Sequence, residues 1–275
     1  MDKAIVLGAF EFLGFHCCSF LLESGLEVNG VHLQESDNRS AEIMRLDIGR
    51  NSNFIEIEES KWCIKKLTEP SIILIDYYDL YIRKKETRFQ EIIGSIFEKD
   101  SEIIRKTDSR IVLLLPLQLL IEEQKNEGRQ PMHRFLEKKK IEDILIQKFY
   151  LPTIYGPFQS QEMLFQQSIM GMLNNENNFT INDREWIGDA IFVKDVVKDI
   201  LMLSEEQPHS FSYLMKSNIE QHWEKCASHL RINLEKKKER EGSNIHQPID
   251  IRMVYSEGDI LNGLQEQKKV FERLL

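Results

Sequence analysis

Glycine and basic residues are both scarce in this chain. Only 13 of its 275 residues are glycine, about 5%, whereas soluble proteins average about 7%. Lysine and arginine together number 36, against 45 aspartate and glutamate residues, so the formal net charge is −9. A nucleic-acid binder presents a basic face to the phosphates. The charge balance therefore argues against a nucleic-acid partner.

Long apolar runs and a cysteine framework are also missing. The longest apolar run extends from Ile111 to Ile121 and is interrupted by Pro116 and Gln118, whereas a membrane span needs about 20 apolar residues. The four cysteines are scattered, and the opening MDKAIVLGAF has no signal-peptide pattern. We therefore expect a cytoplasmic protein with reduced thiols and no membrane partner.

The first 35 residues carry a clear alternation of strand and helix patterns. Short apolar strands are predicted at Lys3–Leu7 and Glu27–Leu33, with a turn at Gly8–Gly14 and an apolar helix at Phe15–Glu23 between them. A strand, a glycine turn, a helix and a second strand within about 30 residues form a βαβ unit. Its two strands are parallel, which requires a right-handed crossover and a sheet covered on both faces.

The same alternation continues to about residue 152. Further strands are predicted at Phe54–Glu58, Ser71–Ile75, Arg110–Leu115 and Gln147–Leu151, and helices at Thr87–Ile104 and Met132–Leu145. Strands that alternate with helices in this way predict an α/β fold with a doubly wound parallel Rossmann sheet.

The pattern changes after Pro152. We predict a loop at Asn174–Asn182, a strand followed by a helix at Ala190–Leu203, and an amphipathic closing helix at Gly263–Leu275. The charge run Glu235–Glu241 is interpreted as a solvated helix end or loop. We therefore divide the chain into a Rossmann-like domain of residues 1–152 and a mixed region of residues 153–275. The mixed region is expected to hold a small C-terminal domain and elements that return to the sheet.

Three segments resemble the extended short-chain dehydrogenases/reductases, the NAD-dependent epimerase/dehydratase group. The stretch KAIVLGAFEFLGFHCCSFLLESGLEVNGV at residues 3–31 is similar to the start of that family. LPTIYGPFQ at residues 151–159 resembles its Arg-Pro-x-x-x-Tyr-Gly-Pro segment, and DAIFVKDVV at residues 189–197 resembles its Asp-Phe-x-x-Val-x-Asp-Val segment. The resemblance implies a Rossmann sheet with a small substrate domain, a bound NAD or NADP, and a catalytic Ser/Thr, Tyr and Lys.

The phosphate-binding turn departs from the family pattern Gly-x-x-Gly-x-x-Gly. The three glycine positions are Gly8, Glu11 and Gly14 here, and Phe10, Phe12 and Leu13 lie between them. Glu11 places a side chain and a negative charge where the backbone of the turn approaches the pyrophosphate. We expect weakened or abolished dinucleotide binding, with the carboxylate itself a candidate occupant of the anion site. In the alternative interpretation Glu11 swings outward and the pyrophosphate still fits.

The acidic residue that ends the second strand in NAD-binding members is also missing. His32 takes that place and carries no carboxylate for the ribose hydroxyls. A protonated His32 could tolerate a 2′-phosphate, but we interpret it as a surface histidine. No cofactor is therefore the main expectation, and NAD or NADP is the alternative.

The family's catalytic residues have no clear counterparts. No Ser or Thr occurs from residue 110 through 152, and no Tyr occurs from residue 82 through 149. The counterpart of the family's Tyr-x-x-x-Lys is Phe135 with Lys139, or Arg134 with Lys138, and Phe135 cannot carry a proton. His133 and Tyr77 are weak substitute acids, and Tyr77 and Tyr78 are interpreted as side chains that fill the cofactor pocket.

No metal site is expected. His222, Cys226 and His229 are spaced as one helix face, but zinc needs a fourth ligand and none is evident. We interpret the three residues as a packing face.

The losses occur together at the turn, the second strand and the catalytic positions. The leading hypothesis is a degenerate epimerase/dehydratase-like protein without hydride-transfer chemistry that acts by binding a protein or small-molecule ligand, and a homodimer is expected. The alternative is an NAD(P)-dependent epimerase, dehydratase or reductase with atypical catalytic residues. A subunit that supports an active partner enzyme is compatible with the first hypothesis.

Overall fold

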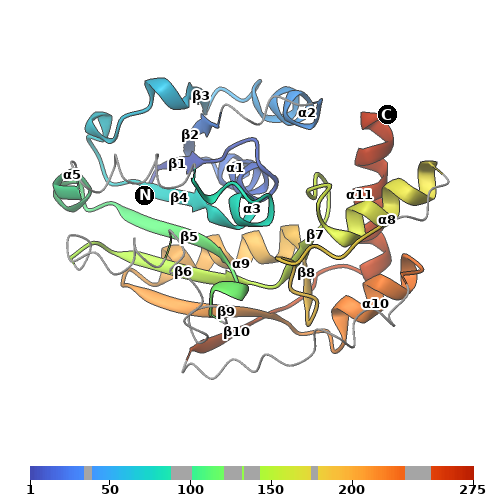
Figure 1. Ribbon diagram of the computed structural model, residues 1–275. Helices are drawn as coiled ribbons and strands as arrows, with labels where there is room; N and C mark the ends of the chain where they lie inside the picture. The colour runs from blue at the N-terminus through green and yellow to red at the C-terminus, as the bar shows by residue number, and fades with distance from the viewer. Residues whose placement is uncertain (34–38, 88–100, 121–131, 133–142, 175–178, 233–248) are drawn as a thin grey trace.

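The computed structural model describes residues 1–33, 39–87, 101–120, 132, 143–174, 179–232 and 249–275. Eight parallel strands form the main sheet in the order β10-β9-β6-β5-β4-β1-β2-β3 (Figure 1). They are β1 (Lys3–Leu7), β2 (Glu27–His32), β3 (Phe54–Glu58), β4 (Ile72–Asp76), β5 (Arg110–Pro116), β6 (Ile146–Leu151), β9 (Phe211–Ser217) and β10 (Asp250–Val254). The prediction of an α/β fold with a parallel Rossmann sheet is confirmed.

The helices lie on the two faces of this sheet and beyond the carboxyl ends of its strands. They are α1 (Phe12–Glu23), α2 (Arg39–Ile48), α3 (Tyr77–Ile82), α5 (Ser101–Lys106), α8 (Leu164–Asn174), α9 (Val193–Glu206), α10 (His222–His229) and α11 (Ile260–Leu274), with short 3₁₀ turns at Glu59–Lys61 and Ile64–Lys66. α1 packs against α9. No helix in the described part of the chain is long and apolar enough to cross a membrane.

Apolar runs explain the central strands. Every residue of β4 and β5 is buried, as expected for strands covered by helices on both faces. The outer strand β3 is mostly exposed instead: Phe54 is buried, whereas Ile55, Glu56 and Glu58 are exposed. The predicted strands at Lys3–Leu7 and Phe54–Glu58 are confirmed, and the others agree to within one residue.

The predicted helix bounds agree with the structure less well than the strand bounds do. α1 begins at Phe12, three residues earlier than predicted, because the turn after β1 is shorter than the glycine spacing suggested. In the predicted helix Thr87–Ile104 the structure describes α5 from Ser101 onward, and residues 88–100 lie outside the described residues. Of Met132–Leu145, residues 133–142 lie outside the described residues and residues 143–145 are not helical. The charge run at residues 235–241 also lies outside them.

A second, smaller core lies beyond the carboxyl ends of the main strands. β7 (Thr153–Tyr155) and β8 (Ala190–Phe192) pair in parallel, and α8, α10 and α11 gather beside them (Figure 1). Their buried side chains include Tyr155, Phe165 and Trp223, which are packed ring against ring. β9 and β10 then return to the main sheet beside β6.

Candidate functional site

The turn between β1 and α1 has the backbone shape that phosphate-binding turns use. Gly8 has a φ of +94°, which glycine adopts readily and other residues rarely do. A Cβ atom on Gly14 would lie 1.9 Å from the Gly8 carbonyl oxygen, so only glycine lets α1 approach the turn this closely. The Glu11 N–H closes the turn by donating to that same oxygen at 2.9 Å. The two outer glycines of the family pattern therefore shape the backbone here.

The side chain of Glu11 points away from the helix it precedes. It accepts no hydrogen bond from the first amides of α1, although Glu11 is the N-cap residue. Instead its carboxylate forms an ion pair with Arg83, the residue after α3. Glu11 is buried, and Arg83 is nearly so. The prediction that the Glu11 carboxylate occupies the anion site of α1 is therefore wrong, because Arg83 holds the carboxylate to one side.

Two other carboxylates occupy the start of α1. The Leu13 N–H donates to Asp79 Oδ2 at 2.8 Å, and the Gly14 N–H donates to Asp76 Oδ2 at 3.0 Å. Asp76 ends β4 and also caps α3 by accepting the Asp79 N–H at 3.1 Å. The free amides of a helix N-terminus normally attract an anion from outside. Here side chains of the same chain take two of them.

Burial raises the pKa of both aspartates. The pKa of Asp76 rises to about 6, because burial disfavours its charged form and the Glu11 carboxylate lies close by. The pKa of Asp79 rises well above its ordinary value, through burial and the charge of Asp76. The raised pKa values mean that this pair takes up a proton more readily than exposed carboxyl groups do, although it lies beside the positive end of the α1 dipole.

Phe10 fills the opposite side of the turn. Its ring centroid lies 5.5 Å from that of His32 and 6.1 Å from that of Phe54, both edge to face. The Arg45 guanidinium stacks 4.7 Å above the same ring. His32 is buried with a relative exposure of 7%, so the interpretation as a surface histidine is wrong. Phe10 therefore reaches β2 and β3 and shields His32 from solvent.

The tyrosines that follow β4 are core residues. Tyr77 is fully buried at the first position of α3. Tyr78 donates its hydroxyl to the Pro152 carbonyl at 3.0 Å and accepts the Ile154 N–H at 3.1 Å. The structure thus places Tyr77 inside the protein, and its role as a substitute acid stays a prediction.

The remaining catalytic candidates cannot be assembled into a site. His133 and Lys139 lie outside the described residues, as does Phe135. The carboxyl end of β5 continues into Leu117 and Gln118, and the Gln118 amide donates to the Arg184 carbonyl. No hydroxyl side chain stands at this end of β5, since the sequence has none there.

The two histidines of α10 differ in burial, and His222 is a packing residue. The Nδ1 of His222 lies 2.7 Å from Ser217 Oγ and its Nε2 lies 3.1 Å from the Tyr155 hydroxyl. Both ring nitrogens are therefore engaged. His229, at the end of α10, is exposed, so the interpretation as a packing face is wrong for that residue. The described residues contain no group of three potential metal ligands.

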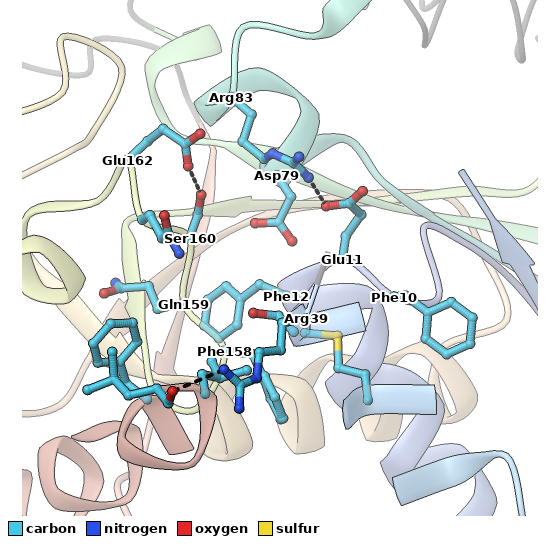
Figure 2. Close-up of a pocket in the computed structure, with 16 residues that line it drawn as sticks. Phe10, Glu11, Phe12, Arg39, Asp79, Arg83, Phe158, Gln159, Ser160 and Glu162 are labelled. Atoms are coloured by element: carbon cyan, nitrogen blue, oxygen red, sulfur yellow. Dashed lines mark hydrogen bonds and ion pairs between the residues drawn. The ribbon is translucent and has the colours of Figure 1, made fainter. Parts of the chain in front are cut away.

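A cavity of about 490 Å³ lies beside the phosphate turn. Its walls come from residues 10–12 of the turn, the start of α2, the end of α3, residues 158–162 and the last turn of α11 (Figure 2). At one end Glu11, Asp79 and Arg83 face one another, and at the other Arg39 donates to the Leu275 carbonyl at 3.1 Å. The volume suits a ligand of small-molecule size.

Three buried glutamines attach α11 to this cavity. The Gln267 side chain accepts the Gly156 N–H at 3.0 Å and donates to Gln159 Oε1 at 2.8 Å and Gln166 Oε1 at 2.9 Å. α11 is thereby tied to the Tyr-Gly-Pro segment and to α8. Phe271 and Leu274, one and two turns farther along α11, are thus placed in the cavity wall.

Sequence reasoning missed the acidic pair and its neighbours. Asp76 and Asp79 follow a buried strand that lies beside β1, and Arg83 stands one helical turn after Asp79. The carboxyl ends of adjacent parallel strands meet at one edge of the sheet, so this spacing could have placed the three side chains beside the turn. The contribution of α11 had no comparable signal, because its contacts with the turn depend on the tertiary fold.

Comparison with solved structures identifies the architecture. The UDP-glucuronic acid 4-epimerase from Bacillus cereus in complex with NAD matches with a TM-score of 0.67 at 15% identity, over 99% of each chain. WbmH from Bordetella bronchiseptica in complex with NAD+ matches with a TM-score of 0.65 at 12% identity, again over 99% of each chain.

A dehydratase has the same architecture. The dTDP-glucose 4,6-dehydratase from Bacillus anthracis in complex with NAD matches with a TM-score of 0.63 at 14% identity, over 99% of this chain and 97% of that one. No family model matches the sequence, and no curated protein matches it. At these identities the likeness is one of fold, and the chain has the fold of the extended NAD-dependent epimerases and dehydratases.

Proposed function

We propose that this chain is a degenerate epimerase/dehydratase-like protein that acts by binding a ligand or a protein and does not transfer hydride. The single observation that carries the proposal is the position of Asp79 and Asp76 on the first amides of α1, at 2.8 and 3.0 Å. A pyrophosphate at this turn would compete with two carboxyl groups that are already hydrogen-bonded there and would meet their negative charge.

Two further features support the same conclusion. Phe10 and Glu11 diverge from the turn and occupy space on either side of it, one against His32 and the other against Arg83. The sequence has no Ser or Thr from residue 110 through 152 and no Tyr from residue 82 through 149. A short-chain dehydrogenase uses such groups to polarise the substrate and to move its proton.

The alternative is an NAD(P)-dependent epimerase, dehydratase or reductase with atypical catalytic residues. It is favoured by the fold, by NAD in the three solved structures named above, and by the cavity beside the turn. Dinucleotide binding in this alternative requires the acidic pair to leave α1. Any acid or base would come from groups such as His133, Lys139 or Tyr77.

The cellular location and the oligomeric state are proposed from the sequence. A cytoplasmic protein with reduced thiols fits the four free cysteines, three of which are buried. A homodimer, or a complex with an active partner enzyme, fits the binding role. Size-exclusion chromatography with light scattering tests the dimer directly.

The central test is titration of the purified chain with NAD(H) and NADP(H) by calorimetry. We expect no binding at millimolar dinucleotide, because the α1 amides are taken. Micromolar affinity would contradict the proposal and favour the alternative. Glu11→Gly alone should not restore binding, since Asp76 and Asp79 remain on α1, whereas Glu11→Gly combined with Asp79→Ala should raise the affinity. Asp189→Asn changes a half-buried aspartate outside the cavity wall and is the matched control.

A further inference from the structure

The cavity beside the turn has an acidic end and an aromatic body. Figure 2 shows Asp79, Glu11 and Arg83 converging at one end. Phe12, Phe158 and Phe271 belong to the rest of the wall. Aromatic faces and carboxylates both attract cations, and an apolar wall suits the flat body of an organic molecule.

Negative charge exceeds positive charge at the acidic end. Glu11, Asp76 and Asp79 lie together there, and Arg83 is the cation that faces them. Arg83 is paired with Glu11. The other arginine in the wall, Arg39, lies at the far end and donates to a backbone carbonyl.

Asp79 is a residue of this acidic end whose carboxyl group lines the cavity. It is 1% exposed, it lines the cavity, and its carboxyl group lies beside the Glu11–Arg83 ion pair (Figure 2). Oδ2 accepts the Leu13 N–H, whereas Oδ1 has no hydrogen-bond partner among the described residues. A buried carboxyl oxygen without a donor is costly, and an N–H group of a ligand would satisfy it.

We infer that this cavity binds an organic cation, an ammonium, amidinium or guanidinium group carried on a flat apolar body, with the cation against Asp79 and the body among the phenylalanines. The inference rests on the proposed function, because it requires that no dinucleotide occupies the turn. The place that holds an anionic cofactor in the solved relatives of the fold thus takes a ligand of opposite charge here.

Matched probes separate charge from shape. 2-Naphthamidine, 2-naphthamide and 2-naphthoate share one ring system and carry charges of +1, 0 and −1. We would titrate each into the full chain at pH 7.5 and follow binding by calorimetry and ligand-observed NMR. 2-Naphthamidine should bind at least tenfold more tightly than the amide, and the carboxylate should not bind.

Variants locate the site. Asp79→Asn preserves the shape of the side chain and should weaken 2-naphthamidine at least tenfold. Asp189→Asn changes a half-buried aspartate that accepts the Ser217 and Ala190 N–H groups outside the cavity, and should leave the affinity unchanged. Near-ultraviolet circular dichroism confirms that each variant is folded.

The possible results distinguish failure of the cation site from failure of the proposed function. Equal affinity for the amidine and the amide, or an unchanged amidine affinity in Asp79→Asn, would overturn the cation site. Loss of affinity in both aspartate variants would also overturn it, since the effect would not be local. The NAD(H) titration is read separately: micromolar NAD binding defeats the proposed function, whereas absent NAD binding with no amidine preference defeats only the cation site.

Discussion

Two regions of this molecule match the same family pattern and use it differently. At the β1–α1 turn the outer glycines set the backbone, and carboxyl side chains accept two of the first amides of α1. At the Tyr-Gly-Pro and Asp-Val segments the matching residues hold the protein together. Asp189 accepts the Ser217 and Ala190 N–H groups at 2.8 Å each. Asp195 accepts the Ser256 hydroxyl at 3.0 Å.

The difference shows that a motif can be kept for its effect on the backbone or for its contact with a ligand. Residues whose task is to shape or fasten the backbone match the family in both regions. Residues whose task is to meet a cofactor differ, as Glu11 and His32 do. A motif match therefore supports the fold more firmly than the activity, since many functions share one fold.

The largest expected effect concerns the backbone of the turn. Gly14→Ala should destabilise the chain by about 4 kcal/mol or abolish folding, because its Cβ would lie 1.9 Å from the Gly8 oxygen. Gly258→Ala is the matched control, because no atom lies within 4 Å of the added Cβ. Thermal unfolding followed by circular dichroism measures both. A stable Gly14→Ala protein would show that the turn can open.

The second largest effect concerns the Gln267 hydrogen bonds that attach α11 to the rest of the protein. Gln267→Ala removes one acceptor and two donor contacts and leaves the Gly156 N–H unpaired in the core. We expect a loss of about 2–3 kcal/mol in the free energy of unfolding. Gln265→Ala, on the exposed side of the same helix, should cost less than about 0.5 kcal/mol. Urea denaturation compares the two. Equal losses would mean that the buried amide network adds nothing.

Asp76 and Asp79 should differ from Gln267, because this acidic pair lowers the stability of the folded state at high pH. The folded-state pKa of Asp76 is raised to about 6 and that of Asp79 is raised further, so the folded state holds a proton that the unfolded state releases above about pH 4. Stability from this pair is therefore present at low pH and is lost as the pH rises through the folded pKa values. Asp79→Asn mimics the protonated group without this dependence.

The variant should thus gain more stability at high pH than at low pH. We expect the gain in the free energy of unfolding from Asp79→Asn to be larger at pH 8 than at pH 5 by about 1–2 kcal/mol. Denaturant titrations at the two pH values measure the difference. Destabilisation at pH 8 would mean that Asp79 serves the fold, like Asp189, and the contrast between the two regions would fail.

The smallest effect concerns the affinity for a cation. Binding against an ionised Asp79 expels its proton, so the affinity for 2-naphthamidine should rise about threefold to tenfold from pH 5.5 to pH 8. The charged groups that face Asp79 are Asp76 on β4, Glu11 on the turn and Arg83 after α3, while Cys17 and Tyr78 stay neutral because burial raises their pKa. Calorimetry in buffers of different ionisation enthalpy counts the proton. A flat profile would exclude Asp79 as the contact.

Much of the fold could be predicted from the sequence. The run Lys3–Leu7 and the buried runs of β4 and β5 predict parallel strands, because such strands are apolar on both faces. The glycines at 8 and 14 predict the turn, since their backbone needs are local. The start of α1 was placed three residues late, because the shape of the turn fixes the helix start and periodicity alone does not show it.

The site could be predicted only in part. The loss of the middle glycine was visible in the sequence, but the direction of the Glu11 side chain depends on Arg83, which lies 72 residues away in the chain. The role of Asp79 depends on the pairing of β4 with β1. The burial of His32 depends on the ring of Phe10. Each of these contacts joins segments that only the tertiary fold brings together.

The internal anion at α1 has a consequence for how the protein responds to its surroundings. A nucleotide-dependent Rossmann protein gains stability when its cofactor supplies the charge that the helix end attracts, so its melting temperature rises with cofactor concentration. In this chain Asp76 supplies that charge from within, through the Gly14 N–H. Under the proposed function, its folded state is uncoupled from the dinucleotide pool of the cell and depends instead on acidity.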